Sequence, residues 1–412
     1  MALQPRHWLA LGLAVHLLFL VSLYTGWLNL FFNDASHTGQ AFDFAVYYIA
    51  GKALAGGHDV YSVEAAFGFR YLPAFAYGIA RPFALLPPQT AYFVYLFLCE
   101  ALLLFNLRLV WRWSIDDNIR ARAACMWLAF SPLYLEYYIG QVSFWAASLL
   151  FWAFYAEVHR VFRGGAIAWI GAVLVKPNAL ILAPAYLRLR RFKTLGWGAL
   201  IVVLSSAPYF WAYPDAWTTF VQRNLSGMQI EGGLTHAGNV GLWGGLVSLG
   251  AKLSDTPLET LSRLDQLPVW VQLLATGVPL LLVAAALWVT FRGKALPLEL
   301  LCLWLTTYFL VYKDVWEHHL VFLLPVLCGL YLHTRQRPLL WIWLLLALPT
   351  PYIFFDVSPG VHGNIDPERT WGILTGLAYR ASVVGPVAVL WVWLARRLLA
   401  NPAPYGTARA DD

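Results

Sequence analysis

Charged side chains are scarce in this sequence. Asp, Glu, Lys and Arg make up only 12% of its 412 residues, whereas hydrophobic residues make up 60% and the mean hydropathy is +0.61. A soluble domain carries about 25% charged residues. The composition therefore excludes an ordinary soluble fold. It predicts an all-α polytopic membrane protein in which residues 1–412 form one integral membrane domain.

Cysteine is also rare, and the four cysteines all fall inside apolar stretches. We interpret them as small core residues rather than as disulfides or metal ligands. No Cys/His spacing typical of zinc occurs, so no metal and no cofactor is predicted. The net charge of +6 comes mostly from short Arg/Lys runs between apolar segments, as the positive-inside rule expects. Membrane topology therefore accounts for the charge, and the predicted partner is the lipid bilayer and not a nucleic acid.

Apolar segments recur along the chain, and a bilayer span needs roughly 20 such residues. The first segment is too long for the apolar part of a signal peptide and has no evident small-residue cleavage site, so we interpret it as a span. The predicted spans are 8–31, 89–111, 122–139, 143–161, 194–213, 268–291, 296–312, 318–333, 338–355 and 371–395.

Basic clusters orient these spans. Arg6 places the N-terminus inside, so segment 32–88 lies outside, and later clusters place 214–267 outside as well. We expect short amphipathic helices in the first of these external segments. We expect the second to pack over the membrane face near the first, and the tail 401–412 to be disordered.

Segment 166–187 has basic residues on both flanks, so a single crossing would put one basic cluster outside. Lys176-Pro177-Asn178 divides it into halves of about ten residues, each near 15 Å of helix and about half of a roughly 30 Å hydrocarbon core. We therefore predict a broken pair of half-helices, either re-entrant or two short spans. Such a break is tolerated only where protein or a cavity covers it.

Asp43 is the strongest candidate for a general base. It lies in the first external segment within Phe42–Tyr48, and its apolar neighbours limit solvation, which tends to raise the pKa of a carboxylate. The alternative is that Asp43 only N-caps a short helix running from Phe44. Asp34 and Asp59 stand among residues typical of turns and are weaker candidates.

Lys176 lies in an otherwise apolar run, where a cation is costly and by default marks a functional site. The alternative is that it snorkels or pairs with a buried carboxylate such as Glu136 or Glu157. In the second external segment, Arg223 could clamp a phosphate. Asn239, near His236 and among glycines, could hydrogen-bond sugar hydroxyls or simply make a turn.

A charged island, Lys313–His319, stands between two spans on the predicted outer side. Lys313, His318 and His319 there would form a phosphate cradle, since ammonium and imidazolium donors strengthen when partly desolvated. The alternative is a solvated turn. Metal binding by the two histidines is disfavoured, because neighbouring helical residues diverge and no third ligand is indicated.

Four short motifs follow one another along the chain. They are Asp43–Tyr48 followed by Gly51, Gly57 and Tyr61; Phe69-Arg70-Tyr71-Leu72-Pro73 leading to Pro82; Gly140-Gln141-Val142-Ser143 and then Lys176-Pro177; and Trp316-Glu317-His318-His319 followed by Pro325. In this order and spacing the sequence resembles glycosyltransferase family 87, in the superfamily of C-type membrane glycosyltransferases. The family often has Asn where Ser143 stands, and Tyr-Pro-Pro where Tyr71-Leu72-Pro73 stands.

The resemblance implies a bundle of about 10–12 transmembrane helices in the inner (plasma) membrane. It implies transfer of mannose from a polyprenyl-phosphate donor to a glycan or glycolipid acceptor, on the periplasmic or extracytoplasmic side and without a nucleotide sugar. Asp43 would be the general base. The expected donor-phosphate ligands are Lys176, Arg223, Lys313, His318 and His319, and the expected sugar or acceptor ligands are Tyr47, Tyr48, Arg70, Tyr71, Gln141, His236, Asn239 and Glu317.

Two alternatives stay open. One is a related transferase that moves another lipid-linked sugar, such as arabinose or aminoarabinose. The other is a secondary transporter or lipid flippase, which a broken helix with a Lys near the bilayer midplane would suit. Against the transporter, no inverted repeat is apparent, and the external segments 32–88 and 214–267 are long for such a protein.

Overall fold

Helices form nearly all of the regular structure. The computed structural model describes residues 4–30, 39–63, 65, 67–225, 239–257, 261, 263–348 and 371–400, and no β-strand occurs within them. The longer helices are α1 (Pro5–Thr25), α3 (Phe42–Ala55), α6 (Pro88–Trp113), α7 (Asp117–Leu128), α8 (Ser131–Ile139), α9 (Ser143–Val158), α10 (Phe162–Val175), α12 (Phe192–Ala212), α13 (Pro214–Leu225), α14 (Leu242–Leu253), α15 (Val269–Arg292), α16 (Pro297–Val311), α17 (Leu323–Thr334), α18 (Pro338–Ala347) and α20 (Ile373–Leu399). The short ones are η1 (Trp27–Leu30), α4 (Pro73–Phe75), η2 (Ala76–Ala80), α5 (Arg81–Ala84), η3 (Pro177–Leu182), α11 (Ala183–Arg188), η5 (Leu264–Gln266) and η6 (Glu317–Phe322). The predicted all-α class is confirmed.

Among the described residues, five helices are long and apolar enough to cross a membrane: α1, α6, α12, α15 and α20. Further apolar helices, including α9, α10 and α16, are shorter. The polytopic prediction is thus confirmed, although several predicted spans are short helices. The predicted span 122–139 is divided between α7 and α8, because Pro132 lies in the first turn of α8 and cannot continue the preceding helix.

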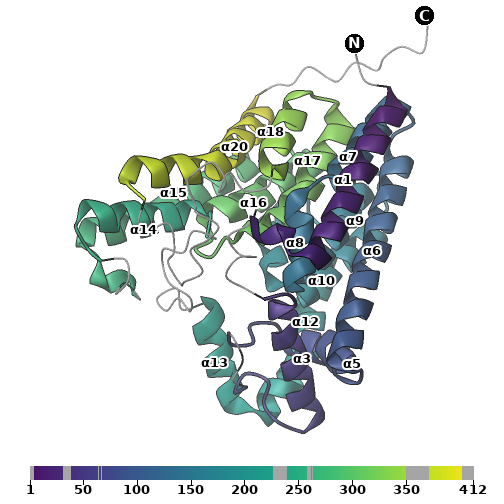
Figure 1. The fold of residues 1–412 in the computed structure, drawn as a ribbon. Coiled ribbons are helices and arrows are strands. Elements are labelled where there is room, and N and C mark those ends of the chain that lie inside the picture. The colour runs from purple at the N-terminus through teal and green to yellow at the C-terminus, as the bar shows by residue number, and fades with distance from the viewer. Residues whose placement is uncertain are drawn as a thin grey trace, which may run out of the picture.

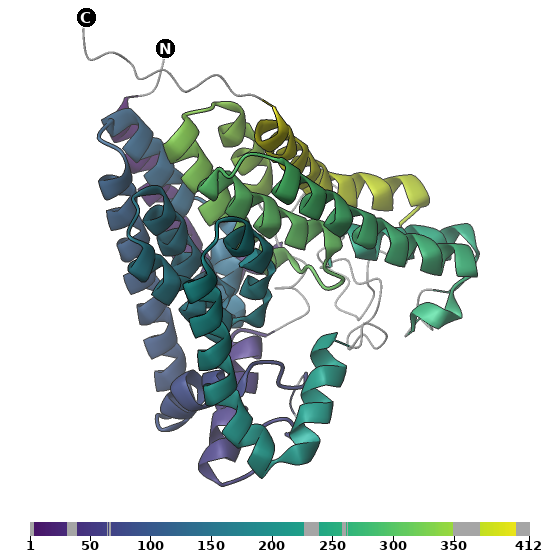
Figure 2. The ribbon, with the colours of Figure 1, turned by 180° about the vertical axis from the view of Figure 1, so that it is seen from behind.

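The helices fall into two groups around the middle of the molecule. Figure 1 shows α1, α6, α7 and α9 on one side and α14, α15 and α20 on the other, with α3, α5 and α13 at the lower end. The view from behind in Figure 2 shows the same division, with α6 nearly upright and α15 oblique to it. Helix α16 packs against both α15 and α20, so it ties the second group together.

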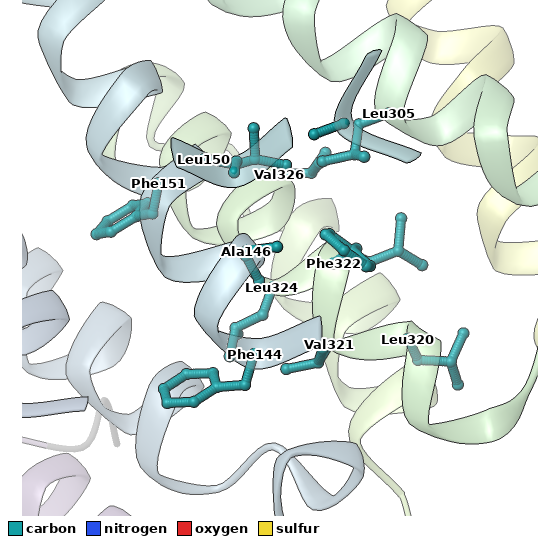
Figure 3. Close-up of a cluster of buried hydrophobic side chains, with 14 of the residues drawn as sticks. Phe144, Ala146, Leu150, Phe151, Leu305, Leu320, Val321, Phe322, Leu324 and Val326 are labelled. Atoms are coloured by element: carbon teal, nitrogen blue, oxygen red, sulfur yellow. The ribbon is translucent and has the colours of Figure 1, made fainter. Parts of the chain in front are cut away.

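The core between these groups is an apolar contact between α9 and the segment η6–α17 (Figure 3). Ala146 and Leu150 of α9 lie beside Leu324 and Val326 of α17, and all of these side chains are buried. The rings of Phe144 and Phe151 point to the other side of α9, where both contact Trp127. The contact fixes the start of α9 relative to η6, which contains Glu317, His318 and His319 of the charged island. Two segments far apart in the sequence are thereby held in a close-packed arrangement.

The chain doubles back at Lys176. Helix α10 ends at Val175, and Lys176 is extended because it precedes Pro177. After the turn, the indole N–H of Trp169 in α10 donates to the Ala179 carbonyl at 3.0 Å, and its ring lies 4.9 Å from that of Tyr186 in α11. The two halves of segment 166–187 therefore run back along each other, and both ends point the same way.

This hairpin generates a topological prediction. Single cysteines replacing the exposed residues Arg163 and Arg190 should both resist an impermeant thiol reagent added to intact cells, because the positive-inside rule predicts that both basic flanks lie on the cytoplasmic side. The four native cysteines are buried and give little background. A cysteine at exposed Ser62, in the predicted external segment, should label. Labelling of position 163 or 190 from outside would overturn the assigned orientation.

Candidate active site

Helix α3 presents Asp43 from its first turn. The helix begins at Phe42, and the N-cap position is Ala41, whose backbone is left-handed with φ 62°. The interpretation of Asp43 as the N-cap of a helix from Phe44 is therefore wrong. A carboxylate in the first turn still interacts favourably with the helix dipole. Its side chain instead accepts a hydrogen bond from a distant segment, at Gln141.

Gln141 is the partner that orients Asp43. Its Nε2 donates to Asp43 Oδ2 at 2.6 Å. Its Oε1 accepts the hydroxyl of Tyr71 at 2.7 Å, the hydroxyl of Tyr47, and the backbone N–H of Val142 at 2.9 Å. Because three donors converge on the amide oxygen, the amide nitrogen is left to face the carboxylate.

The turn that carries Gln141 lies directly against α3. Gly140 has φ +76°, and a Cβ atom there would lie 2.4 Å from Cβ of Phe44. The backbone N–H of Ala41 donates to the carbonyl of Tyr138 at 2.7 Å on the same interface. Glycine is therefore needed at position 140 both for the left-handed backbone and for the close approach.

The environment of Asp43 suits a proton acceptor. The side chain is 7% exposed and lies outside the candidate spans. Burial raises the pKa of its carboxyl to about 7, although the Lys176 ammonium, the Gln141 hydrogen bond and the Arg70 guanidinium all lower it. Asp43 is thus about half ionised near neutral pH, where a general base is most effective.

A cavity of about 280 Å³ opens in front of Asp43. It is lined by seven of the residues singled out from the sequence: Asp43, Arg70, Tyr71, Gln141, Lys176, His318 and His319. The remaining lining residues are Phe42, Phe67, Ile139, Pro177, Asn178, Asn224, Tyr312, Asp314 and Trp316. Residues from α3, the 67–72 loop, the Gln141 turn, the Lys176 turn and the charged island thus meet in one place.

Two cations line this cavity. The Nζ atom of Lys176 donates to Ser143 Oγ at 2.5 Å and lies 5.8 Å from the centre of the Phe322 ring. Arg70 Nη1 lies 3.0 Å from Asp314 Oδ2 in an ion pair. Among the described residues, no carboxylate is in direct contact with the Lys176 ammonium, whereas the Arg70 guanidinium already has one.

His318 and His319 differ from the expected imidazolium pair. Burial lowers the pKa of both imidazoles well below the ordinary value of 6.5, and the nearby Lys176 ammonium lowers it further. The backbone N–H of Trp316 donates to His319 Nδ1 at 3.2 Å and anchors that ring. At neutral pH the two side chains therefore face the cavity as uncharged groups.

Some predicted ligands lie one layer away from the cavity. The Tyr47 hydroxyl contacts Gln141 and Tyr71 from behind. Tyr48 lies on another face of α3, and its hydroxyl donates to the Leu86 carbonyl at 2.8 Å. Arg223 of α13 donates to the Tyr61 carbonyl at 2.8 Å, so it packs the second external segment against the first.

The other predicted ligands support the charged island rather than line the cavity. Asn239 is buried, and its Nδ2 donates to the Lys313 carbonyl at 2.8 Å. Glu317 Oε1 accepts the hydroxyl of Tyr379 at 3.1 Å, and Arg380 donates to the Asn239 carbonyl. Helix α20 therefore anchors both the island and the segment beside it. His236 lies outside the described residues.

Sequence reasoning did not select Asn178, Tyr312, Asp314 or Asn224. Two of them carried a usable signal, since Asn178 follows Lys176-Pro177 and Asp314 belongs to the charged island. Asn178 Nδ2 donates to the Tyr308 hydroxyl at 2.7 Å, a contact between segments that no local pattern reveals. Among the described residues, no group of three or more His, Cys, Asp or Glu side chains is placed to hold a metal ion. The expectation of metal-free chemistry stays a prediction.

The close approach at Gly140 predicts a selective loss of stability. Gly140→Ala should lower the stability of the purified protein by about 1–3 kcal/mol, the cost of overpacking, because the new methyl group collides with Phe44. Thermal unfolding in detergent measures this. Gly277→Ala in α15 is the matched control, since no atom lies within 4 Å of a Cβ there, and it should unfold at or above the wild-type temperature. Equal melting of the two variants would contradict the tight contact.

Comparison with known proteins tests the family resemblance that the four motifs suggested. A family model described as "Glycosyltransferase family 87" matches residues 69–312, which is more than half of the 412 residues. No curated protein gave a match. The match begins after Asp43 and ends before the histidine pair, so it speaks for the family and not for those side chains. The resemblance drawn from the motifs is confirmed at this level: the chain belongs to glycosyltransferase family 87 and is a membrane glycosyltransferase.

Proposed function

We propose that the protein transfers mannose from a polyprenyl-phosphate donor to a hydroxyl of a glycan or glycolipid acceptor, with Asp43 as the general base. The observation that carries this proposal is a single cavity in which a buried carboxylate with a pKa of about 7 faces Lys176, Arg70 and two neutral imidazoles. The family match supports glycosyl transfer over the transporter alternative. The reaction would take place at the extracytoplasmic face of the inner membrane.

In the proposed reaction, Asp43 accepts the proton of the acceptor hydroxyl as its oxygen attacks the anomeric carbon. The bond from that carbon to the phosphate oxygen breaks, and the electron pair leaves with the polyprenyl phosphate. A single displacement inverts the anomeric centre, so a β-linked donor gives an α-linked product. The Gln141 amide keeps Asp43 oriented throughout, because its hydrogen bond goes to Oδ2 at 2.6 Å.

The leaving phosphate would be stabilised by Lys176, His318 and His319, which line the same cavity as Asp43. Lys176 supplies a full charge, and His318 and His319 supply neutral hydrogen-bond donors in a region shielded from water, where such interactions are strong. Arg70, paired with Asp314, lies close enough to Asp43 and Lys176 to act on both electrostatically. Arg223 and Lys313 do not line the cavity. Arg223 would act through the loop carbonyl of Tyr61 that it holds.

The proposed donor sugar is mannose. Tyr71, Arg70 and Gln141 line the cavity and would contact sugar or acceptor hydroxyls. Purified protein incubated with a panel of polyprenyl-phosphate sugars should release polyprenyl phosphate fastest from the mannose donor. Faster release from an arabinose or aminoarabinose donor would favour the related transferase instead.

The role of Asp43 predicts a large kinetic effect. Asp43→Asn conserves the shape of the side chain and removes the proton acceptor, so sugar transfer should slow at least about a hundredfold, the lower end of the contribution of acid–base catalysis. Donor binding should persist. For the wild-type enzyme, kcat/KM should rise with pH through about 7, because only the ionised carboxylate accepts a proton.

Asp59→Asn is the matched control for this experiment. Asp59 Oδ1 accepts the Tyr209 hydroxyl at 2.6 Å and the Tyr61 N–H at 3.0 Å, and an asparagine oxygen can accept both. That variant should retain transfer close to wild type. An Asp43→Asn enzyme with more than a tenth of wild-type transfer would show that the base lies elsewhere.

The proposed phosphate contacts of His318 and His319 predict a separate effect on the KM for the donor. His318→Ala or His319→Ala should raise the KM for the donor about three- to tenfold, the usual effect of losing one hydrogen bond, while the protein stays folded. His333→Ala is the control, because His333 is exposed near the far end of α17. Wild-type turnover by both variants at low donor concentration would mean that the phosphate binds elsewhere.

A further inference from the structure

One buried carboxylate next to the cavity has no part in the proposed reaction. Glu136, in α8, is fully buried. Its Oε2 accepts the backbone N–H of Phe144 at 3.0 Å, in the first turn of α9. Its Oε1 has no hydrogen-bond partner within the described part of the chain. A buried carboxylate satisfied on one oxygen is costly unless a cation compensates for it.

The cation that meets this requirement is Lys176. Burial raises the pKa of the Glu136 carboxyl and lowers the pKa of the Lys176 amine. Among the charged groups, Lys176 opposes the shift of Glu136 most strongly, and Glu136 opposes the shift of Lys176 most strongly, so the charge of each depends on the other. Ser143 lies between them, since its Oγ accepts from Lys176 Nζ at 2.5 Å and its hydroxyl lies within reach of the Glu136 carboxylate. The three side chains therefore form a line that runs from the core to the cavity wall.

Other charged and titratable groups also face Lys176, but none can serve as its permanent counter-ion. They are Asp43 of α3, Asp314 and Arg70 on the loops at the cavity wall, and His318 and His319 of η6. Asp43 changes its protonation in each proposed turnover. Asp314 is already paired with Arg70 at 3.0 Å. Glu136 alone among the carboxylates that act on Lys176 lies behind the wall and does not line the cavity.

We propose that Glu136 is a positioning residue that keeps Lys176 protonated and, through Ser143, aimed at the site of the donor phosphate. This inference rests on the proposed function, because it assigns Lys176 to that phosphate. A lysine that is buried without a counter-ion tends to lose its proton. With Glu136 behind it, Lys176 keeps a positive charge in front of the arriving phosphate even while Asp43 is protonated.

The test measures binding of a polyprenyl phosphate, without acceptor, by the rise in melting temperature in detergent at several pH values. Glu136→Gln keeps the size of the side chain and an acceptor for the Phe144 N–H, but removes the charge. Binding should weaken about tenfold, as for the loss of an interaction with a charged group. The loss should grow as the pH rises from 6 to 8, because Lys176 loses its proton more easily.

Two further variants make the result specific. Adding Lys176→Arg to Glu136→Gln should restore binding and remove its pH dependence, since a guanidinium stays charged. Glu157→Gln is the matched control: Glu157 is a buried carboxylate of α9 paired with Arg191 at 2.8 Å, away from the cavity, and its loss should leave binding unchanged. If Glu136→Gln does not fold, Ser143→Ala should weaken binding by several-fold.

The possible outcomes distinguish the proposed function of the protein from the proposed role of Glu136. Wild-type protein that fails to bind the polyprenyl phosphate would overturn the proposed function and this inference with it. Wild-type protein that binds, together with a Glu136→Gln protein that binds equally well at every pH, would overturn the inference alone and leave Glu136 as a cap for α9. Weaker binding by Glu136→Gln that Lys176→Arg does not rescue would also overturn it.

Discussion

The hydrogen bond between the Gln141 amide and the Asp43 carboxylate is the constraint on which the site depends. It joins residues 98 positions apart in the sequence, and it is made where water is excluded. Three donors fix the amide oxygen, so the amide cannot flip and present an oxygen to the carboxylate. Gly140 brings this turn against α3 at a distance that no other residue allows. A carboxylate held in this way is fixed before any substrate arrives, which would suit the proposed role of Asp43 as a preorganised base.

Charge balance is the second principle of the site. Arg70 lies against Asp314, and Lys176 is opposed by carboxylates both in front of it and behind it. Opposite charges that share a poorly solvated space keep the cost of burial low, because each screens the other. The arrangement leaves His318 and His319 neutral, so they contribute oriented hydrogen-bonding groups rather than charge. This balance would suit the proposed donor, since a lipid-linked phosphate would meet one cation that, among the residues described, has no carboxylate in direct contact.

Much of this could be predicted from residue chemistry. The scarcity of charged residues predicted the membrane fold. The lysine inside an apolar run predicted the break at position 176. The charged island predicted where the histidine pair lies. The predicted ligands that do not line the cavity share one property. Asn239 and Glu317 hold backbone or tyrosine groups of other segments, and Arg223 holds a loop carbonyl. A polar side chain that supports a loop and one that lines a cavity look alike in sequence, since only tertiary contacts decide between them. Asp314 and Asn178 lie beside selected residues in the sequence, but only their tertiary contacts place them at the cavity.

Helix α20 carries a consequence for biogenesis. Tyr379 and Arg380 anchor Glu317 and Asn239, and so hold the island that carries the histidines. The ribosome makes every residue that lines the cavity before it makes α20. The nascent chain therefore passes through a stage in which all lining residues are already synthesised but the island still lacks its brace. We therefore expect the island to reach its final position only when α20 inserts and these two contacts form.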